Sequence, residues 1–198
     1  MKTPRTSRAA ALLAALVISG CGSDDFFATL PTEPREATLF DLFGPIIERP
    51  AGFDLATGPG PSRTDLTSQF DFVFAITPAG APGCFSGFTA GEPVFLPRGC
   101  FEDLDASSGL SRSDRTFEEV VTASGNVEDY VSEAAVLADS GAVYVLRSRP
   151  DPGLSSTCRR YLKLEVLSLD PVTGALTLRF LWNPNCNLRN LPTGSTGS

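Results

Sequence analysis

Residues 159–182 read RRYLKLEVLSLDPVTGALTLRFLW, two alternating apolar runs separated by DPVTG at 170–174. Alternation with a period of two is typical of β-strands, and the Asp-Pro and Gly of the separator are turn residues. Folding the segment about Val172 places apolar side chains opposite one another, and these pairs are Leu162–Trp182, Leu164–Phe180 and Val166–Leu178. The sequence therefore predicts an antiparallel hairpin with one wholly apolar face.

The opposite face of this hairpin is polar. In the same register Glu165 faces Arg179, a complementary charge pair, and we expect Lys163, which lies beside Glu165 on this face, to form a cross-strand salt bridge. The register was set from the turn alone, and it also places Cys158 opposite Cys186. We therefore predict a Cys158–Cys186 disulfide that closes the base of the hairpin.

Further strand-like runs precede the hairpin. We predict strands at 37–43, 69–76 and 141–149, shorter ones at 53–55 and 92–97, and a strand or helical turn at 116–121. Phe70, Phe72 and Phe74 alternate along the second run, which predicts one aromatic face in the core. Glycine and proline punctuate the chain between these runs. The expected fold is mostly β: a single antiparallel β domain over residues 37–190, as a sheet or a sandwich with long loops.

The N-terminus has the layout of a secretory signal peptide. Three basic residues within 1–8 precede an apolar run at 9–18 and the small pair Ser19-Gly20. Ten apolar residues are far short of the roughly 20 that span a bilayer. Residues 17–21, VISGC, resemble the bacterial lipobox. That resemblance implies a lipoprotein signal peptide at 1–20, cleavage before Cys21 and lipidation of Cys21, and the alternative is an ordinary cleaved signal.

Several expectations follow from a lipid anchor. Residues 21–36 are expected to form the lipidated N-terminus and a tether, and residues 191–198 a disordered tail, by composition. The protein would attach to the membrane of the bacterial cell envelope through its acyl chains. Because Gly22 and not aspartate follows Cys21, we expect the outer membrane, facing the periplasm or the exterior.

Four cysteines remain beyond Cys21, an even number in a chain predicted to be exported. Such cysteines are typical of disulfides, and once Cys158 pairs with Cys186, Cys84 and Cys100 pair by elimination. Each bridge is expected to contribute about 2–4 kcal/mol. Metal binding is the alternative, but the CxxC spacing and histidine are both missing, so we predict no metal site.

Composition excludes several functions. The formal charge is −7, and it becomes −10 without residues 1–20, which carry three basic and no acidic residues. Nucleic acid is therefore not an expected partner, because its binding depends on Lys and Arg that neutralise phosphates. The chain has no histidine, so nucleophile systems that need one cannot form.

The order of segments resembles the HmuY-like lipoproteins of bacterial envelopes. The matching segments are LFDL at 39–42, FDFVF at 70–74, FEEV at 117–120, GAVYVLRS at 141–148 and RYLKL at 160–164. The resemblance implies a β scaffold at the envelope, and its best-known members bind haem through paired histidines. Without histidine a haem site would need Tyr130, Tyr144 or Tyr161 as the axial ligand, and cross-strand packing explains Tyr144 and Tyr161 better. We therefore expect no cofactor.

The only basic concentration of the chain is a candidate anion-binding patch. It comprises Arg147, Arg149, Arg159 and Arg160, and the alternative is charge balance with neighbouring carboxylates. We expect a membrane-anchored, non-catalytic binding module for a small ligand or an unknown envelope protein. The alternatives are a structural or assembly lipoprotein without a small ligand and a hydrolase that uses carboxylates alone.

Overall fold

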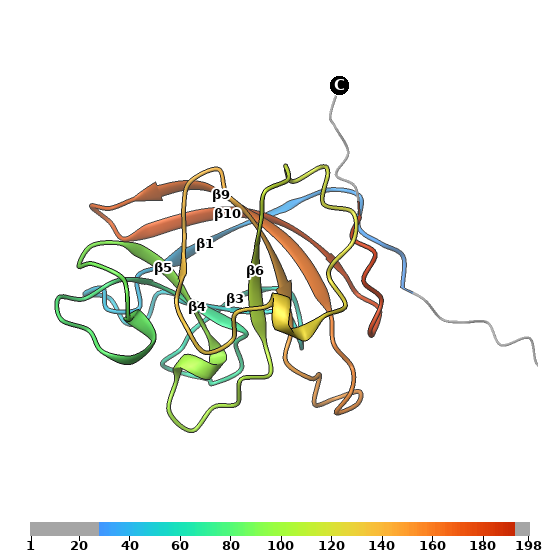
Figure 1. The fold of residues 1–198 in the computed structure, drawn as a ribbon, viewed down its shortest axis with the longest axis horizontal. Helices are drawn as coiled ribbons and strands as arrows, with labels where there is room; N and C mark the ends of the chain where they lie inside the picture. The colour runs from blue at the N-terminus through green and yellow to red at the C-terminus, as the bar shows by residue number, and fades with distance from the viewer. Residues whose placement is uncertain (1–27, 193–198) are drawn as a thin grey trace, which may run out of the picture.

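The structure is a computed structural model that describes residues 28–192, and its regular secondary structure consists almost entirely of β-strands joined by long loops (Figure 1). The strands are β1 (Arg35–Phe40), β2 (Gly52–Asp54), β3 (Gly60–Ser62), β4 (Phe72–Ile76), β5 (Pro93–Pro97), β6 (Gly109–Ser113), β7 (Val136–Leu137), β8 (Val143–Arg147), β9 (Tyr161–Asp170) and β10 (Ala175–Asn183). Three short 3₁₀ helices lie between them, at Gly83–Phe85, Arg98–Cys100 and Val127–Asp129. None of the helices in this part of the chain is long and apolar enough to span a membrane.

The strands form two antiparallel sheets of five strands each. Sheet I has the order β1-β10-β9-β8-β6, and sheet II has the order β3-β2-β4-β5-β7. Apolar side chains of both sheets fill one core between them, where Phe53 of sheet II packs edge-on against Phe180 of sheet I at 5.1 Å. Phe95 and Tyr144 bridge the sheets in the same way at 5.3 Å. The domain is therefore a sandwich, in agreement with the predicted antiparallel β fold.

The predicted hairpin is formed by β9 and β10. Its register holds from the turn-distal end up to Leu178, which pairs with Val166, and a bulge between Thr177 and Leu178 then shifts the pairing by one residue. The apolar pairs face the core as expected. Glu165 and Arg179 form the predicted ion pair.

Both predicted disulfides are confirmed. Cys158 and Cys186 join the chain ends beyond the hairpin, with their Cα atoms 4.9 Å apart. Cys84 and Cys100 are bonded with a Cα–Cα distance of 5.6 Å. This bond joins the loop between β4 and β5 to the 3₁₀ helix that follows β5. Two strand ends and one long loop are thereby held covalently.

The prediction for Lys163 is wrong. Its side chain has no exposed surface, and its Nζ donates hydrogen bonds to the carbonyls of Phe117 and Val120 at 2.7 and 3.0 Å. Residues 116–130 fold over the outer face of sheet I, and the predicted element at 116–121 is one helical turn, because the Val120 amide donates to the Thr116 carbonyl. Among the described residues Lys163 forms no salt bridge. Burial lowers the pKa of the Lys163 amine to about 8.

The domain boundaries differ slightly from those predicted. β1 begins at Arg35, within the expected tether, and the backbone of Ala28 exchanges hydrogen bonds with the Asn185 side chain at 2.7 and 3.0 Å. Leu191, expected in the tail, is buried and bonded to the Val121 carbonyl. The predicted signal peptide, Cys21 and residues 193–198 lie outside the described residues.

Candidate functional site

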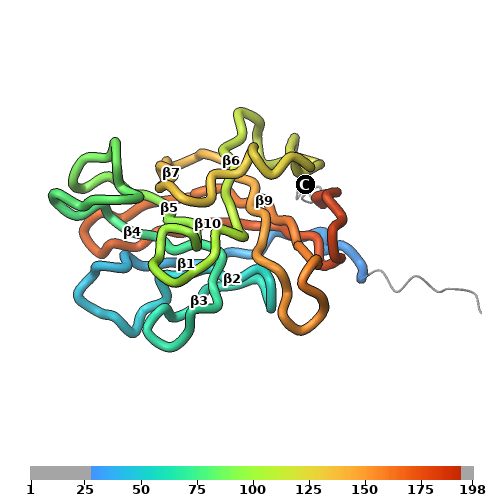
Figure 2. Tube along the Cα trace, turned by 60° about the horizontal axis from the view of Figure 1, so that its bottom comes forward, coloured from blue at the N-terminus to red at the C-terminus, as the bar shows by residue number. Residues whose placement is uncertain are grey.

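A loop of sequence DLFGPIIER, residues 41–49, leaves the end of β1 and separates two hollows. Backbone hydrogen bonds fix the loop at its base: the amide of Phe40 donates to the Pro50 carbonyl at 2.9 Å, and the amide of Leu42 donates to the Phe74 carbonyl at 3.1 Å. We call this segment the 41–49 loop. It lies at the end of the molecule farthest from the point where the described chain begins (Figure 2).

Asp41 joins three parts of the fold beneath the loop. Its Oδ1 accepts hydrogen bonds from the amides of Phe43 and Ile76, and its own amide donates to the Gly174 carbonyl. Gly174 has a φ of +63°, and a Cβ there would lie 3.0 Å from the Asp41 Cβ. Only glycine suits this position, since the backbone is left-handed and the approach is close. The loop is thus attached to β4 and to the β9–β10 turn.

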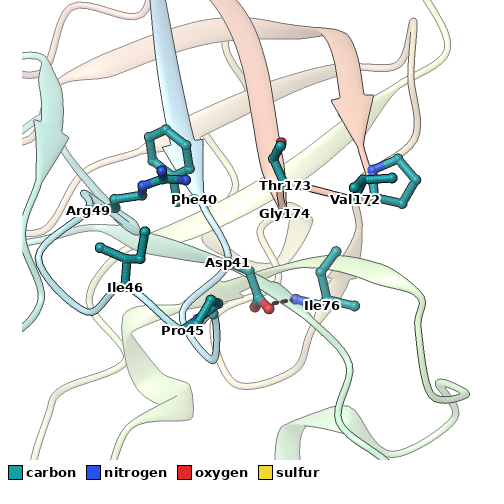
Figure 3. Close-up of a pocket in the computed structure, with 11 residues that line it drawn as sticks. Phe40, Asp41, Pro45, Ile46, Arg49, Ile76, Val172, Thr173 and Gly174 are labelled. Atoms are coloured by element: carbon teal, nitrogen blue, oxygen red, sulfur yellow. Dashed lines mark hydrogen bonds between the residues drawn. The ribbon is translucent and has the colours of Figure 1, made fainter.

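The smaller hollow lies between the loop and the β9–β10 turn (Figure 3). Its volume is about 310 Å³, and Ile46 and Val172 stand on opposite sides of it. Asp41 occupies the floor, where the figure shows its bond to the Ile76 amide. The Oδ1 atom of Asp41 is therefore already engaged in hydrogen bonds within the protein.

The larger hollow lies on the other side of the loop, over the outer face of sheet II, and measures about 480 Å³. Phe70 and Phe101 form an aromatic wall with ring centroids 5.1 Å apart, and Leu42, Ala51 and Leu104 add apolar surface. The rest of the lining comprises Ile46 and Ile47, three hydroxyl residues and four charged residues: Thr64, Thr67, Ser68, Asp41, Arg49, Asp65 and Glu102. The volume and the apolar lining are those of a small-molecule site.

The aromatic stripe predicted in 69–76 divides here. Phe72 and Phe74 face the core, whereas Phe70 lies on the outer face with Val73. The chain is irregular just before β4, because the Asp71 amide donates to the Phe53 carbonyl and the Asp71 side chain turns into the sandwich. Phe70 is thereby turned to the outer face of sheet II, where it is buried beside Ala51 and Val73 and lines the base of the hollow.

Large apolar side chains stand exposed around the two hollows. Four of them have more than half of their surface open to solvent: Phe43 (53%), Ile47 (69%), Leu66 (71%) and Val172 (92%). Exposed apolar residues that gather around a concave surface mark binding sites more often than scattered ones do. This rim and the larger hollow form the candidate site.

The predicted anion-binding patch is split by the structure. Arg149 is buried against Asp54 at 2.7 Å and also contacts Asp71 at 3.5 Å, and Arg160 pairs with Asp151 at 2.9 Å. These two arginines therefore balance carboxylates, as the alternative interpretation expected.

Arg147 and Arg159 form no ion pair among residues 28–192. Arg147 donates to the Ser107 carbonyl, and Nη1 of Arg159 is buried without a hydrogen-bond partner. Burial and the neighbouring charge of Arg147 lower the pKa of Arg159. Anion binding at these two residues stays a prediction.

Asp71 organises the polar centre of the sandwich. Its carboxylate accepts hydrogen bonds from the amides of Arg149, Leu55 and Ala56. Burial raises the pKa of this carboxyl to about 6, although the charge of Arg149 opposes the rise. The group has no exposed surface and belongs to the structural core.

The three tyrosines are all buried and serve packing. The Tyr144 hydroxyl donates to the Leu137 carbonyl 2.5 Å away, and the Tyr130 hydroxyl donates to the Ser124 carbonyl at 3.0 Å. Burial raises the pKa of both hydroxyls, which opposes the tyrosinate form that a haem iron needs. Tyr161 is buried beside Tyr130.

Within residues 28–192 no cluster of three or more His, Cys, Asp or Glu side chains has a geometry suited to a metal ion. Comparison of the chain with family models, curated proteins and solved structures finds no match. The argument for function therefore rests on the candidate site itself.

Sequence reasoning did not find this site. Its walls come from three loops, around 41–49, 64–70 and 101–104, that meet only through the pairing of β2, β4 and β5. One signal was available: FGPII at 43–47 is apolar although it lies beside glycine and proline, where loops are usually polar.

Proposed function

We propose that this protein is a lipid-anchored protein of the bacterial envelope that binds a small apolar ligand in the larger hollow without catalysing a reaction. The observation that carries the proposal is an apolar hollow of about 480 Å³ whose rim exposes Ile47 and Leu66. Leaving such side chains in water is unfavourable by roughly 25 cal/mol per Å² of apolar surface, and a ligand would remove that surface from water.

The position of the N-terminus supports an anchored orientation. The described chain begins beside Asn185, near the Cys158–Cys186 bridge, and β1 then runs the length of its pairing with β10 to reach the 41–49 loop. An acyl anchor at Cys21 would thus leave the loop and the rim of the hollow directed away from the membrane (Figure 1). The two disulfides support an extracytoplasmic location.

A catalytic role finds less support. A carboxylate-only hydrolase needs two carboxyl groups facing a cleft, about 5–10 Å apart. Asp54 and Asp71 lie together, but both bind Arg149, and Asp71 has no exposed surface. The HmuY-like relationship stays a prediction, and four of the segments on which it rests overlap β1, β4, β8 and β9.

Binding can be tested with the neutral, apolar dye N-phenyl-1-naphthylamine, whose fluorescence rises in apolar surroundings. We expect saturable binding to the purified protein. Ser68→Trp should abolish it, because Ser68 lines the larger hollow and an indole would occupy the space. Ser156→Trp is the matched control, since Ser156 shares with Ser68 only a separate hollow beside Arg98 and Arg149.

Three outcomes would count against the proposal. Dye binding that is absent, or that is equally weakened by both tryptophan variants, would refute the larger hollow as the site. Stable co-purification with one envelope protein, lost in Leu66→Ser while dye binding is absent, would favour the assembly role instead.

Anchoring is tested separately. We expect Cys21→Ser to move the protein from the membrane fraction to the soluble fraction of the envelope, and mass spectrometry of the unaltered protein to find acyl chains on Cys21. A Cys21→Ser protein that fractionates with the membrane like the unaltered protein would contradict lipidation.

A further inference from the structure

Arg49 stands on the partition between the two hollows and lines both of them. Its guanidinium lies over the Phe40 ring, 4.6 Å from the centroid, which holds the group in place by a cation–π contact. Figure 3 shows the side chain extended beside Phe40 at the edge of the smaller hollow. A fixed cation therefore borders an apolar space.

This guanidinium is free of anionic partners in the described part of the chain. Arg49 is in none of the ion pairs that the structure forms. The three carboxylates of the larger hollow are hydrogen-bonded or open to water. Asp65 pairs with Arg63 at 2.6 Å, and Asp41 accepts hydrogen bonds from two backbone amides. Glu102 is exposed. Arg49 is thus the one cation of this lining, and none of the described carboxylates lies within salt-bridge distance of it.

A planar guanidinium is suited to a carboxylate, which it can bind through two parallel hydrogen bonds. Such a pair gains strength beside an apolar wall, because less water screens the charges there. The adjoining space, lined by Phe70, Phe101 and Leu104, would receive a hydrocarbon portion. The two features together select a ligand with an apolar chain and an anionic head.

We propose that the larger hollow binds an apolar carboxylate of the acyl-chain type, with its chain against Phe70 and Phe101 and its carboxylate on Arg49. This inference rests on the proposed function, because it names the ligand class of the same site. It runs against the net charge of −7, which repels anions in general. Selectivity for an anion would therefore have to come from the local site.

The test compares decanoate with decanol, which share a chain length and differ in charge, as competitors of bound N-phenyl-1-naphthylamine at pH 7.5. We expect half-displacement by decanoate at a concentration at least fivefold lower than by decanol. In Arg49→Gln this preference should disappear while dye and decanol affinities stay within twofold. Arg115→Gln should keep the preference, because Arg115 is exposed and lines neither hollow beside the 41–49 loop.

The possible results separate the two proposals. If the dye binds but decanol competes as well as decanoate, or if the preference survives Arg49→Gln, the carboxylate proposal is overturned and the apolar site stands. If Arg49→Gln removes binding of all three compounds, Arg49 supports the loop and does not receive a carboxylate, which also overturns it. Absence of dye binding to the unaltered protein refutes the proposed function and this inference with it.

Discussion

The outer faces of the two sheets are both covered by long loops, and they differ in what the loops leave open. Hollows at the edge of the sheet I cover are lined largely by polar side chains, whereas the hollow over sheet II has a largely apolar surface. Over sheet I, residues 116–130 and Leu191 exclude water so fully that Lys163 is buried and must hydrogen-bond to two carbonyls. Over sheet II, the 41–49 loop and residues 101–104 leave a hollow with an exposed apolar rim. The Lys163 amine is hydrogen-bonded inside the cover of sheet I, whereas apolar side chains of the cover of sheet II remain exposed to water.

This difference separates stability from binding within one fold. The closed cover hides an ionisable group and stabilises the domain, although Val121 and Val127 at its surface are 44% and 56% exposed. The open cover leaves some of its own apolar side chains exposed to water. A ligand bound in the hollow would bury them, which explains the exposure. Substitutions should therefore affect unfolding on sheet I and binding on sheet II.

The largest contrast is expected between two phenylalanines. Phe117 of the closed cover is 1% exposed, and Phe117→Ala should lower the free energy of unfolding by about 3–5 kcal/mol. Phe101 of the open cover is only partly buried, and Phe101→Ala should cost less than about 2 kcal/mol while weakening dye binding. Urea unfolding and dye titration measure the two effects. Equal destabilisation by both variants would contradict the difference between the covers.

Removal of either disulfide should have the next largest effect. Loops of 28 and 16 residues predict losses of about 3.6 kcal/mol for the Cys158→Ser/Cys186→Ser pair and about 3.1 kcal/mol for Cys84→Ser/Cys100→Ser. Only the second change should also weaken dye binding, because Cys100 precedes Phe101 in the wall of the hollow. Dye affinity reduced by the first pair alone would place the binding surface elsewhere.

The pH dependence of stability should report Lys163 directly. Burial lowers the pKa of this amine to about 8, whereas in the unfolded chain it is about 10.4. Between these values the unfolded state binds more protons, so the free energy of unfolding should rise with pH, by up to about 1.4 kcal/mol per pH unit. Urea unfolding at pH 7.5–9.5 tests this, with Lys163→Met as the control that removes the rise. A profile identical in both proteins would show that Lys163 is not held as described.

Much of the fold could be predicted because it depends on local alternation. The β9–β10 register and the Cys158–Cys186 bridge follow from one hairpin, where strand period and turn chemistry act together, and Cys84–Cys100 then follows by elimination. β3, β6 and β7 were not predicted, because they are short and contain glycine, proline and serine or only two residues. Their strand geometry is imposed by neighbouring strands.

What the sequence did not predict depends on contacts between segments that are far apart along the chain. Lys163 was expected in water because the hairpin alone has a polar face, and only the fold brings residues 116–130 over it. The arginine patch divides between its two interpretations, because Arg149 meets Asp54 and Asp71 from distant segments and Arg160 meets the nearby Asp151. The hollow depends on three loops, and a sequence pattern in any one of them does not reveal it.

The smallest stability effect is expected at the rim. Leu66 is 71% exposed, so Leu66→Ser should change the free energy of unfolding by no more than about 0.5 kcal/mol. It should nevertheless weaken dye binding measurably, because Asp65 and Thr67 on either side line the hollow. Thermal or urea unfolding provides the first value and dye titration the second. A loss above 2 kcal/mol would show that the rim is part of the folded core.

Amide chemical-shift mapping by NMR, with N-phenyl-1-naphthylamine added to the labelled protein, tests the difference between the covers most directly. The account predicts saturable shifts concentrated in residues 41–51, 64–70 and 101–104, with residues 116–123 and Lys163 unaffected. Shifts centred on the cover of sheet I, or spread evenly over both sheets, would contradict it.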